Sequence, residues 1–336
     1  MNVHPALKAI IKPTENRYYA VFRDDARQID IPVYRYTESE VEQRLQEMLV
    51  PFRYREDDDL VHIALVQTEA HKYMFFDVAH VIGDGITMNI LMEDLKKIYD
   101  GVAVPKEKYT FYEYILDAKA KEDAGVREKD SAAVDRLMKG YRMRQTLLTR
   151  HDRQDCTKGV YGVIRRRLDR IVRKEILYYC KKYNVSENAL FLSAFNYTAA
   201  LFSDEEDIFV NSIHSGRTDG RWTGLAGCLF KTYLCRYERI HHEKVDELIT
   251  RTGSQIMETM KNYSPVSRMG DLFLQYQGDI LSVPTPGDRP GERMHCLQLD
   301  SLPFHMQIMF DEDGFYTELR YWENRFDRQT LEIFLT

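Results

Sequence analysis

The residues with the clearest chemical potential form one pattern, His80-Val81-Ile82-Gly83-Asp84-Gly85, in which a histidine stands four positions before an Asp-Gly pair. A neutral imidazole can accept a proton near physiological pH. It can therefore assist an amine or a hydroxyl that attacks an acyl group. The alternative to this catalytic interpretation is a structural histidine at the end of a strand, followed by an ordinary turn. The pattern by itself leaves both interpretations open.

The segment before this pattern predicts a strand. Residues 73–80 are rich in aromatic and apolar side chains, and alternation places Phe76, Val78 and His80 on one face. The imidazole would then stand at the end of the strand above an apolar surface. Loops at strand ends are where binding and catalytic residues concentrate.

The segment after the pattern predicts a helix over residues 86–99, because its apolar side chains recur at helical spacing. Gly83 and Gly85 permit backbone angles that other residues resist. Asp84 would lie at the positive end of this helix, where a carboxylate is favoured. We therefore expect Asp84 to point away from the reacting centre and to hold the loop by pairing with an arginine.

The other predicted elements interleave strands with helices in both halves of the chain. Periodicity predicts strands at 17–24, 61–67, 160–168 and 208–214, and helices at 39–49, 170–183 and 186–202. This interleaving indicates an α/β or α+β fold.

Turn signals and polar stretches divide the chain. The prolines and glycines of residues 283–291 predict a loop, and Asp313-Gly314 between two alternating segments predicts a hairpin. Residues 150–159 are hydrophilic and weakly patterned. We therefore expect an N-terminal lobe over residues 1–155 and a C-terminal lobe over residues 156–336.

Composition excludes several classes of protein. The 336 residues have a net charge of −6, which argues against a general nucleic-acid binder. The basic run Arg165-Arg166-Arg167 is typical of a protected strand edge, and a docking patch for an acidic partner is the alternative. The first five residues lack the basic and apolar regions of a signal peptide, so we expect none, and no apolar run reaches the roughly 18 residues that a membrane span needs. Five widely spaced cysteines fit a reducing cytoplasm.

Other chemical motifs are weak or missing. His241-His242-Glu243 lacks a further ligand at helical spacing, so we expect surface histidines. The spacing of His62, His71 and His80 matches no metal template, and we expect no metal site. The sequence contains no GxSxG, Walker or GxGxxG motif, so it does not favour a nucleophile-elbow hydrolase or a nucleotide-binding enzyme.

The HxxxDG pattern on a predicted strand, loop and helix resembles the condensation domains of non-ribosomal peptide synthetases. More broadly it resembles the chloramphenicol-acetyltransferase-like acyltransferases. Further segments are similar to family motifs in order and spacing over nearly the whole chain. They are His4-Pro5-Ala6-Leu7, Ser215-Gly216-Arg217, the segment 227–236 that resembles GxFVNTxxLR, Phe273-Leu274-Gln275-Tyr276-Gln277, and residues 321–326.

This resemblance implies two acetyltransferase-like lobes arranged in a V with a tunnel between them and His80 midway along it. A donor acyl group and an acceptor would arrive from opposite mouths, each on the phosphopantetheine arm of a carrier domain. His80 would help the acceptor amine attack the donor thioester, with Asp84 and Gly85 completing the motif. Side chains expected to line the tunnel are Ser215, Arg217, Tyr276 and Gln277. For Ser215, a turn-forming serine is the alternative.

The sequence departs from the family pattern at several positions. Ala79 replaces the first of two histidines, at a position that the resemblance marks as structural, and Lys231 replaces an asparagine. The arginine expected after His-Pro-Ala-Leu falls on Lys8 or Ile10, which leaves Arg217 as a candidate partner for Asp84. The family also has a strand and a helix upstream of His-Pro-Ala-Leu, so we expect a chain shortened at its N-terminus.

Three functional hypotheses follow from the resemblance. The first is an amide-forming condensation domain that uses carrier-bound thioesters. The second is a stand-alone acyltransferase that moves an acyl group from coenzyme A or a carrier to an alcohol or amine. The third is an inactive module that binds carriers and positions other domains. We expect carrier domains as partners, no nucleic acid or membrane, no cofactor bound by the chain itself, and a cytoplasmic monomer or part of a multidomain synthetase.

Overall fold

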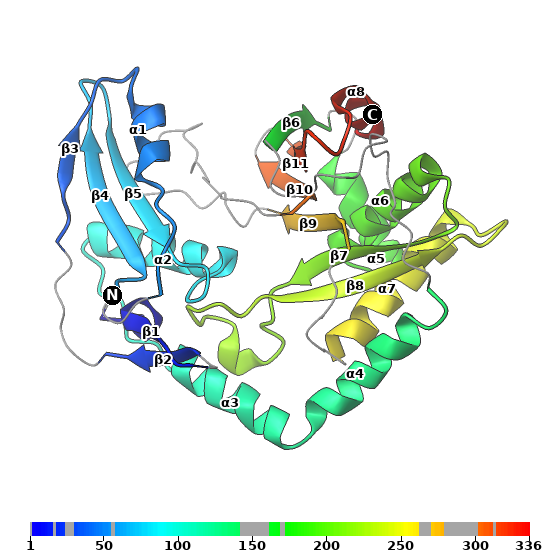
Figure 1. The fold of residues 1–336 in the computed structure, drawn as a ribbon, viewed down its shortest axis with the longest axis horizontal. Coiled ribbons are helices and arrows are strands. Elements are labelled where there is room, and N and C mark those ends of the chain that lie inside the picture. Colours follow the sequence, from blue (N-terminus) through cyan, green and yellow to red (C-terminus); the bar gives the residue numbers. More distant parts are fainter. Residues whose placement is uncertain are drawn as a thin grey trace. The chain divides into compact units, whose positions relative to one another are not determined.

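A computed structural model describes most of the chain, and its secondary structure is drawn in Figure 1. The described residues are 2–15, 18–23, 30–54, 58–141, 161–168, 172–261, 270–278, 302–311 and 314–336. They form two compact units. The first is built from residues 1–120 together with 216–229, and the second from most of the remaining chain. The boundary expected near residue 155 lies outside the described residues.

The first unit combines two small sheets with helices. In the two-stranded sheet β1 (Ala9–Pro13) pairs antiparallel with β2 (Tyr18–Phe22). The three-stranded sheet has the order β3 (Val33–Arg35), β4 (Val61–Gln67), β5 (Lys72–Val78), with β3 parallel and β5 antiparallel to β4. Its helices are η1 (Pro5–Lys8), α1 (Val41–Met48), α2 (Gly85–Tyr99), the first ten residues of α3 (Phe111–Asp123), and η2 (Gly220–Trp222).

The strand and helix around the central pattern form largely as the sequence predicts. Strand β5 ends at Val78 rather than at residue 80, because the chain turns there. The backbone N–H of Ala79 donates to Leu60, and that of Ile82 donates back to Ala79. His80 therefore lies in a turn just beyond the strand. The predicted strand, which ended at His80, was two residues too long.

The apolar core of the first unit anchors this turn. Buried side chains from η1, β1, β4 and α2 meet in one cluster that includes Ala79 and Ile82, each 1% exposed. Burial of an isoleucine side chain stabilises the folded state by about 2 kcal/mol. Ala79 and Ile82, on either side of His80, are thus held in the apolar core, and this packing restricts movement of the turn.

The segment 216–229 packs onto the first unit through its own apolar residues. Trp222, Leu225 and Leu229 are buried in a cluster with Phe111 of α3. Gly227 lies so close to this ring that an added Cβ would be 2.4 Å from a carbon of Phe111. A side chain at this position would therefore displace the segment or the ring.

The second unit is built on a six-stranded sheet covered by helices. The strand order is β6 (Tyr161–Arg167), β11 (Gly314–Trp322), β10 (Phe304–Asp311), β9 (Leu272–Gly278), β7 (Asp207–His214), β8 (Lys231–Glu238). Strand β9 is parallel to its neighbours β10 and β7, whereas the other pairs are antiparallel. The helices are α4 (Val126–Leu137), α5 (Arg173–Tyr183), α6 (Glu187–Ser203), α7 (Val245–Lys261) and α8 (Arg328–Phe334).

Helix α6 is the central helix of this unit, and the sequence predicts it well. The Ser186 side chain caps its N-terminus by accepting from the Ala189 N–H, and Asp204 ends it in the left-handed conformation. Buried residues of α6 join those of α5, α7, α8 and the strands in one large core. The helix is buried on several sides, as its nearly uniform apolar sequence predicts.

Two further expectations concern the edge and the hairpin of this sheet. Strand β6, which contains the arginine run, is an edge strand, as expected. Arg165 pairs with Glu318 and Arg167 with Asp311, so these charges are partly satisfied within the sheet. Strands β10 and β11 form the predicted antiparallel pair with Asp311 opposite Gly314; Asp313 lies outside the described residues.

The mixed α/β composition of both units confirms the expected fold class. Within the described part of the chain, no helix is both long and apolar enough to cross a membrane.

Candidate functional site

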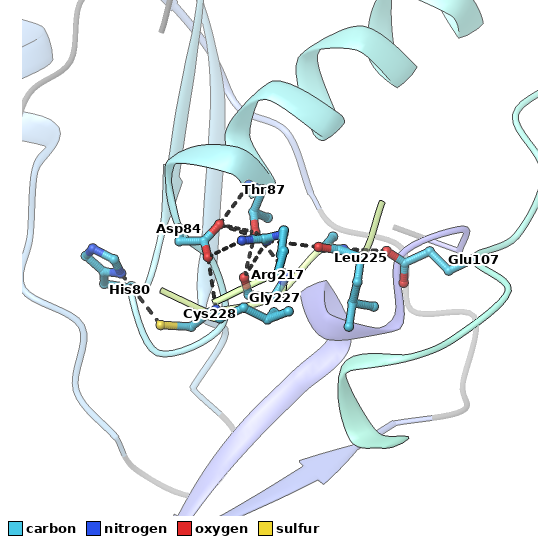
Figure 2. Close-up of polar contacts among 10 residues, drawn as sticks. His80, Asp84, Thr87, Glu107, Arg217, Leu225, Gly227 and Cys228 are labelled. Atoms are coloured by element: carbon cyan, nitrogen blue, oxygen red, sulfur yellow. Dashed lines mark hydrogen bonds and ion pairs between the residues drawn. The ribbon is translucent and has the colours of Figure 1, made fainter. Parts of the chain in front are cut away.

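His80 is exposed on a turn in which Ala79 and Ile82 are buried and Val81 is exposed. Its Nδ1 atom lies 4.0 Å from the Sγ atom of Cys228, at the outer limit of a sulfur hydrogen bond. Figure 2 shows the imidazole at one end of the polar group, with Cys228 between it and the other residues. An imidazole on a fixed turn can approach a second molecule without rearrangement of the backbone.

Asp84 has the opposite environment, because it is 5% exposed and surrounded by donors. Its side chain caps helix α2 by accepting from the Thr87 N–H at 2.9 Å. Arg217 donates to both carboxylate oxygens, at 2.8 and 3.0 Å, and the Leu229 N–H donates at 2.9 Å. This bidentate arrangement is the strongest form of an arginine–carboxylate contact.

Arg217 is committed to this network. Its side chain is 4% exposed, and besides Asp84 it donates to the carbonyl oxygens of Leu225 and Gly227, at 3.0 and 3.3 Å. The sequence offered Arg217 both as a partner of Asp84 and as a tunnel-lining residue. The structure contains the ion pair, and the guanidinium serves to hold the segment 216–229 rather than to face an open surface.

The electrostatics of this pair follow from its burial. Burial alone would raise the pKa of the Asp84 carboxyl, but the hydrogen bonds and charge of Arg217, with the N–H groups of Thr87 and Leu229, bring it below its usual value. Asp84 is therefore ionised at neutral pH and accepts hydrogen bonds only. In this state it cannot donate a proton to a reaction, so its contribution is to fix the loop.

Thr87 links helix α2 to the segment 216–229, and the sequence analysis missed it. The Gly227 N–H donates to Thr87 Oγ1 at 2.9 Å, and this hydroxyl faces both the Gly227 carbonyl and Asp84, at 2.8 and 2.9 Å. All of these groups are buried. A threonine three residues after a helix-capping aspartate was the available signal, but its distant partner was not visible in the sequence.

Cys228 is a neutral thiol beside His80. Burial, and after it the negative charge of Asp84, raises the pKa of this thiol to about 12, against the opposing charge of Arg217. A nucleophilic cysteine needs a lowered pKa. The Cys228–His80 pair therefore does not have the electrostatics of a cysteine-nucleophile site, and the thiol can serve only as a weak donor or a packing group.

Gly85, the third motif residue, is the first residue of helix α2 and directly follows the capping Asp84. It thus begins the helix whose N-terminus holds the Asp84 carboxylate. His80, Asp84, Gly85 and Arg217 all belong to the first unit.

The other three predicted residues belong to the second unit. Ser215 directly follows β7. The Tyr276 hydroxyl donates to Glu187 Oε2 at 2.8 Å, and its ring stacks on Phe191 of α6. Gln277 is buried in β9, next to an irregularity in its pairing with β10. A role for these three residues in lining a substrate passage stays a prediction.

A histidine with a shifted pKa lies in the second unit. His214 ends β7 opposite Lys231, the residue that replaces the family asparagine, and its ring is 6.0 Å from that of Tyr233. Burial, and then the charge of Lys231, lowers the pKa of His214 to about 4. This histidine is therefore neutral at physiological pH. The sequence gave no signal for it, because its burial and its cross-strand neighbour are set by the tertiary fold.

The remaining histidine motifs contain no metal cluster in the part of the chain that is described. His241 is exposed and lies 3.5 Å from Glu206. His62 and His71 contact separate carboxylates, Asp77 and Glu38. No group of three potential metal ligands occurs among the described residues.

Comparisons with known proteins agree with the motif. A family model described as "Condensation domain" matches residues 1–275. Surfactin synthase subunit 1 of Bacillus subtilis (strain 168) is 23% identical over 204 residues, which cover 60% of this chain and 6% of that protein. Gramicidin S synthase 2 of Brevibacillus brevis is 31% identical over 78 residues, covering 23% of this chain and 2% of that protein. The chain thus corresponds to a small part of these relatives.

Solved structures share the fold over almost the whole chain. The epimerization domain from the third module of tyrocidine synthetase B aligns with a TM-score of 0.79 at 15% identity, covering 99% of this chain and 82% of that one. A cyclization–docking bidomain of a non-ribosomal peptide synthetase from Sorangium cellulosum also aligns with a TM-score of 0.79, at 14% identity, covering 99% and 73%. At these identities the likeness concerns the fold alone, and it agrees with the acetyltransferase-like architecture that the sequence predicted.

Proposed function

Because the chain belongs to the condensation-domain family, we propose that it forms an amide bond between a carrier-bound acyl or peptidyl thioester and a carrier-bound aminoacyl acceptor. The observation that supports this most is the exposed imidazole of His80 on a turn that the buried Asp84–Arg217 pair and the apolar core hold in place.

The proposed step balances without any further reactant. The acceptor amine attacks the thioester carbonyl, a C–N bond forms, and the C–S bond breaks. The amine loses a proton and the departing thiolate gains one. His80 would accept or orient the proton on the attacking nitrogen, a role that typically contributes about 10²–10⁴ in rate.

The residues around His80 would hold the reacting geometry. Asp84 caps helix α2 and pairs with Arg217, and Gly85 begins that helix. Ala79, in place of the first family histidine, is buried in the apolar core. This burial supports a packing role for position 79. The absence of a histidine there would therefore leave the proposed chemistry to His80.

The thiol-bearing group would come with the substrates. Phosphopantetheine arms of donor and acceptor carriers would bring the two acyl groups, and the chain would supply no cofactor of its own. The chain spans 6% of surfactin synthase subunit 1, so we propose that it acts as one domain of a synthetase. We propose a cytoplasmic location for it. Ser215, Tyr276 and Gln277 would lie along the substrate path.

One reconstituted reaction tests this proposal. Donor and acceptor carriers are loaded, the protein is added, and the mass of the intact acceptor carrier is followed. We expect an acceptor heavier by the donor acyl group, and loss of that product with His80→Ala. His71→Ala is the matched control, because His71 is an exposed histidine of the same unit that pairs with Glu38.

Three outcomes would contradict the proposal. Product that forms equally with His80→Ala would remove His80 from the mechanism. Transfer from acyl-coenzyme A to a free amine or alcohol, without transfer between carriers, would indicate a stand-alone acyltransferase. Carriers that bind without any product would indicate an inactive scaffold module.

A further inference from the structure

One edge of the six-stranded sheet gathers polar side chains. Strand β9 is parallel to β7 and to β10, so these three strands end at the same edge. His214 is the last residue of β7, and Lys231 begins the antiparallel strand β8 directly opposite it. Ligands of sheets with parallel strands bind beyond the carboxyl ends of those strands. This edge is therefore a candidate binding site within the second unit.

Helix α6 begins at the same edge. The Tyr276 hydroxyl, near the end of β9, donates to Glu187 in the first turn of α6 at 2.8 Å. The Asn188 amide of the same turn donates to the Tyr233 hydroxyl of β8 at 2.8 Å. These contacts place the first turn of α6, the end of a helix that favours negative charge, beside the strand ends.

Lys231 supplies a positive charge to this edge. Burial, and after it the charge of Lys231, lowers the pKa of His214 to about 4. The ammonium therefore lies close enough to act on the imidazole, which is neutral at physiological pH. A carboxylate beside His214 would raise this pKa instead, and no carboxylate of a described residue is among the causes of the shift. The electrostatic potential at His214 is thus positive.

The acidic side chain at this edge is engaged by other groups. Glu187 accepts from Tyr276 through Oε2, and its Oε1 atom lies 3.5 Å from Nε of Arg173. Glu187 and Arg173 thus form an ion pair without net charge. Lys231, in contrast, contributes a positive potential that an anionic ligand would experience at His214.

We propose that Lys231 is a specificity-determining residue, which selects a substrate with a carboxylate on the acyl donor or on the aminoacyl acceptor. This inference rests on the proposed function, because His214 directly precedes Ser215, which we placed on the substrate path. An ammonium is a compact charge on a flexible stem, so it can reach a carboxylate in more than one orientation. The neutral imidazole of His214 offers one donor and one acceptor to the same ligand.

Binding of soluble analogues tests the charge preference without turnover. The probes are pantetheine thioesters of aspartate and asparagine, each with a free amine as acceptor analogue and with an acetylated amine as donor analogue. Nuclear magnetic resonance of the His214 ring, assigned by its loss in His214→Phe, follows binding. In one of the two pairs we expect the aspartate thioester to bind about tenfold more tightly, the scale of a hydrogen bond to a charged group. Equal affinities within both pairs would overturn the proposal.

The variant Lys231→Met removes the charge and keeps an unbranched side chain. We expect it to lose the preference for the aspartate thioester, while the pKa of His214 rises. Lys181→Met is the matched control, because Lys181 is an exposed lysine on α5 of the same unit, and it should keep the preference. A preference that survives in a folded Lys231→Met protein would contradict the role of Lys231.

Turnover separates this inference from the proposed function. With aspartate or asparagine loaded on donor and acceptor carriers, we expect about a tenfold preference in kcat/KM for aspartate at one position, lost in Lys231→Met. Product without a charge preference would overturn the inference and leave the proposed function intact. An equal fall for both substrates in Lys231→Met would also overturn it, and would indicate contact with the phosphate of the carrier arm. No product from any pair, with preferential binding of an aspartate analogue, would contradict the proposed function alone.

Discussion

Two parts of one short motif have opposite environments. Asp84 and Arg217 are nearly inaccessible, and each makes several charge-assisted hydrogen bonds to side chains and backbone. His80, four residues away from Asp84, is exposed on a turn beside a neutral thiol. The contrast supports the proposed division of roles, in which the aspartate and arginine hold the backbone and the histidine would meet the substrate.

The largest expected effect is a loss of stability when the buried Asp84–Arg217 pair is broken. Asp84→Ala leaves the Arg217 guanidinium buried without its counter-charge, and breaking such a pair costs about 3–5 kcal/mol of unfolding free energy. Chemical denaturation followed by circular dichroism measures this loss. Asp100→Ala, at the exposed far end of the same helix, is the matched control and should have little effect.

A double variant sharpens the same prediction. Asp84→Leu combined with Arg217→Met removes both charges together, and we expect it to be more stable than either single change, because no isolated charge remains buried. An Asp84→Ala protein as stable as the wild type would show that the pair does not support the loop.

The next largest effect on stability is expected at His214, a half-buried imidazole that contrasts with the exposed His80. Its pKa is lowered to about 4 from 6.5 in the folded protein. The unfolded chain therefore binds a proton between these pH values while the folded chain resists it, so stability falls as pH decreases through this window. We expect a loss on the order of 2–3 kcal/mol.

Denaturation of the wild type and of His214→Phe at a series of pH values checks this expectation. The variant lacks the titrating group, so it should lose less stability between these two pH values than the wild type. Equal acid sensitivity of the two proteins would show that His214 titrates normally in the folded state.

A smaller effect is expected at Thr87. Thr87→Val removes the hydroxyl that accepts from the buried Gly227 N–H, and an unsatisfied buried donor costs about 1–3 kcal/mol. Thr87→Ser keeps the hydroxyl and is the matched control. A Thr87→Val protein that unfolds at the same denaturant concentration as Thr87→Ser would contradict a contribution from the hydrogen bond.

The smallest effect is expected at Cys228. Because its thiol is neutral, Cys228→Ser should change turnover by no more than about threefold, the scale of a weak sulfur contact. Single-turnover assays with loaded carriers measure this change. A loss as large as that of His80→Ala would mean that the thiol takes part in the chemistry, and the comparison between a reactive His80 and supporting neighbours would need revision.

The sequence predicted the local elements of the site well. The β5 strand and the α2 helix have strong periodicity, and a capping aspartate marks the start of α2. The expected α6 also formed, because its apolar run is long and its serine cap is unambiguous. The main local error was the last two residues of the predicted strand, where the Ala79 backbone turns instead.

The contacts between distant segments were harder to predict. Arg217 was available as a candidate only because the Ser-Gly-Arg motif drew attention to it, since 133 residues separate it from Asp84. Thr87 with Gly227, and His4 with Glu107, have no local signature. Such pairings depend on where the segment 216–229 and the residues before α3 pack in the tertiary structure. Hydrophobic periodicity predicts local helices and strands but not these long-range contacts.

The central claim is that His80 serves the reaction and not the fold. The most direct measurement is turnover between loaded carriers, together with the unfolding free energy, on the same preparation of His80→Ala. We predict a fall in turnover of about 10²–10⁴, with stability within about 0.5 kcal/mol of the wild type. Retained turnover, or a loss of turnover matched by a loss of stability, would contradict the claim.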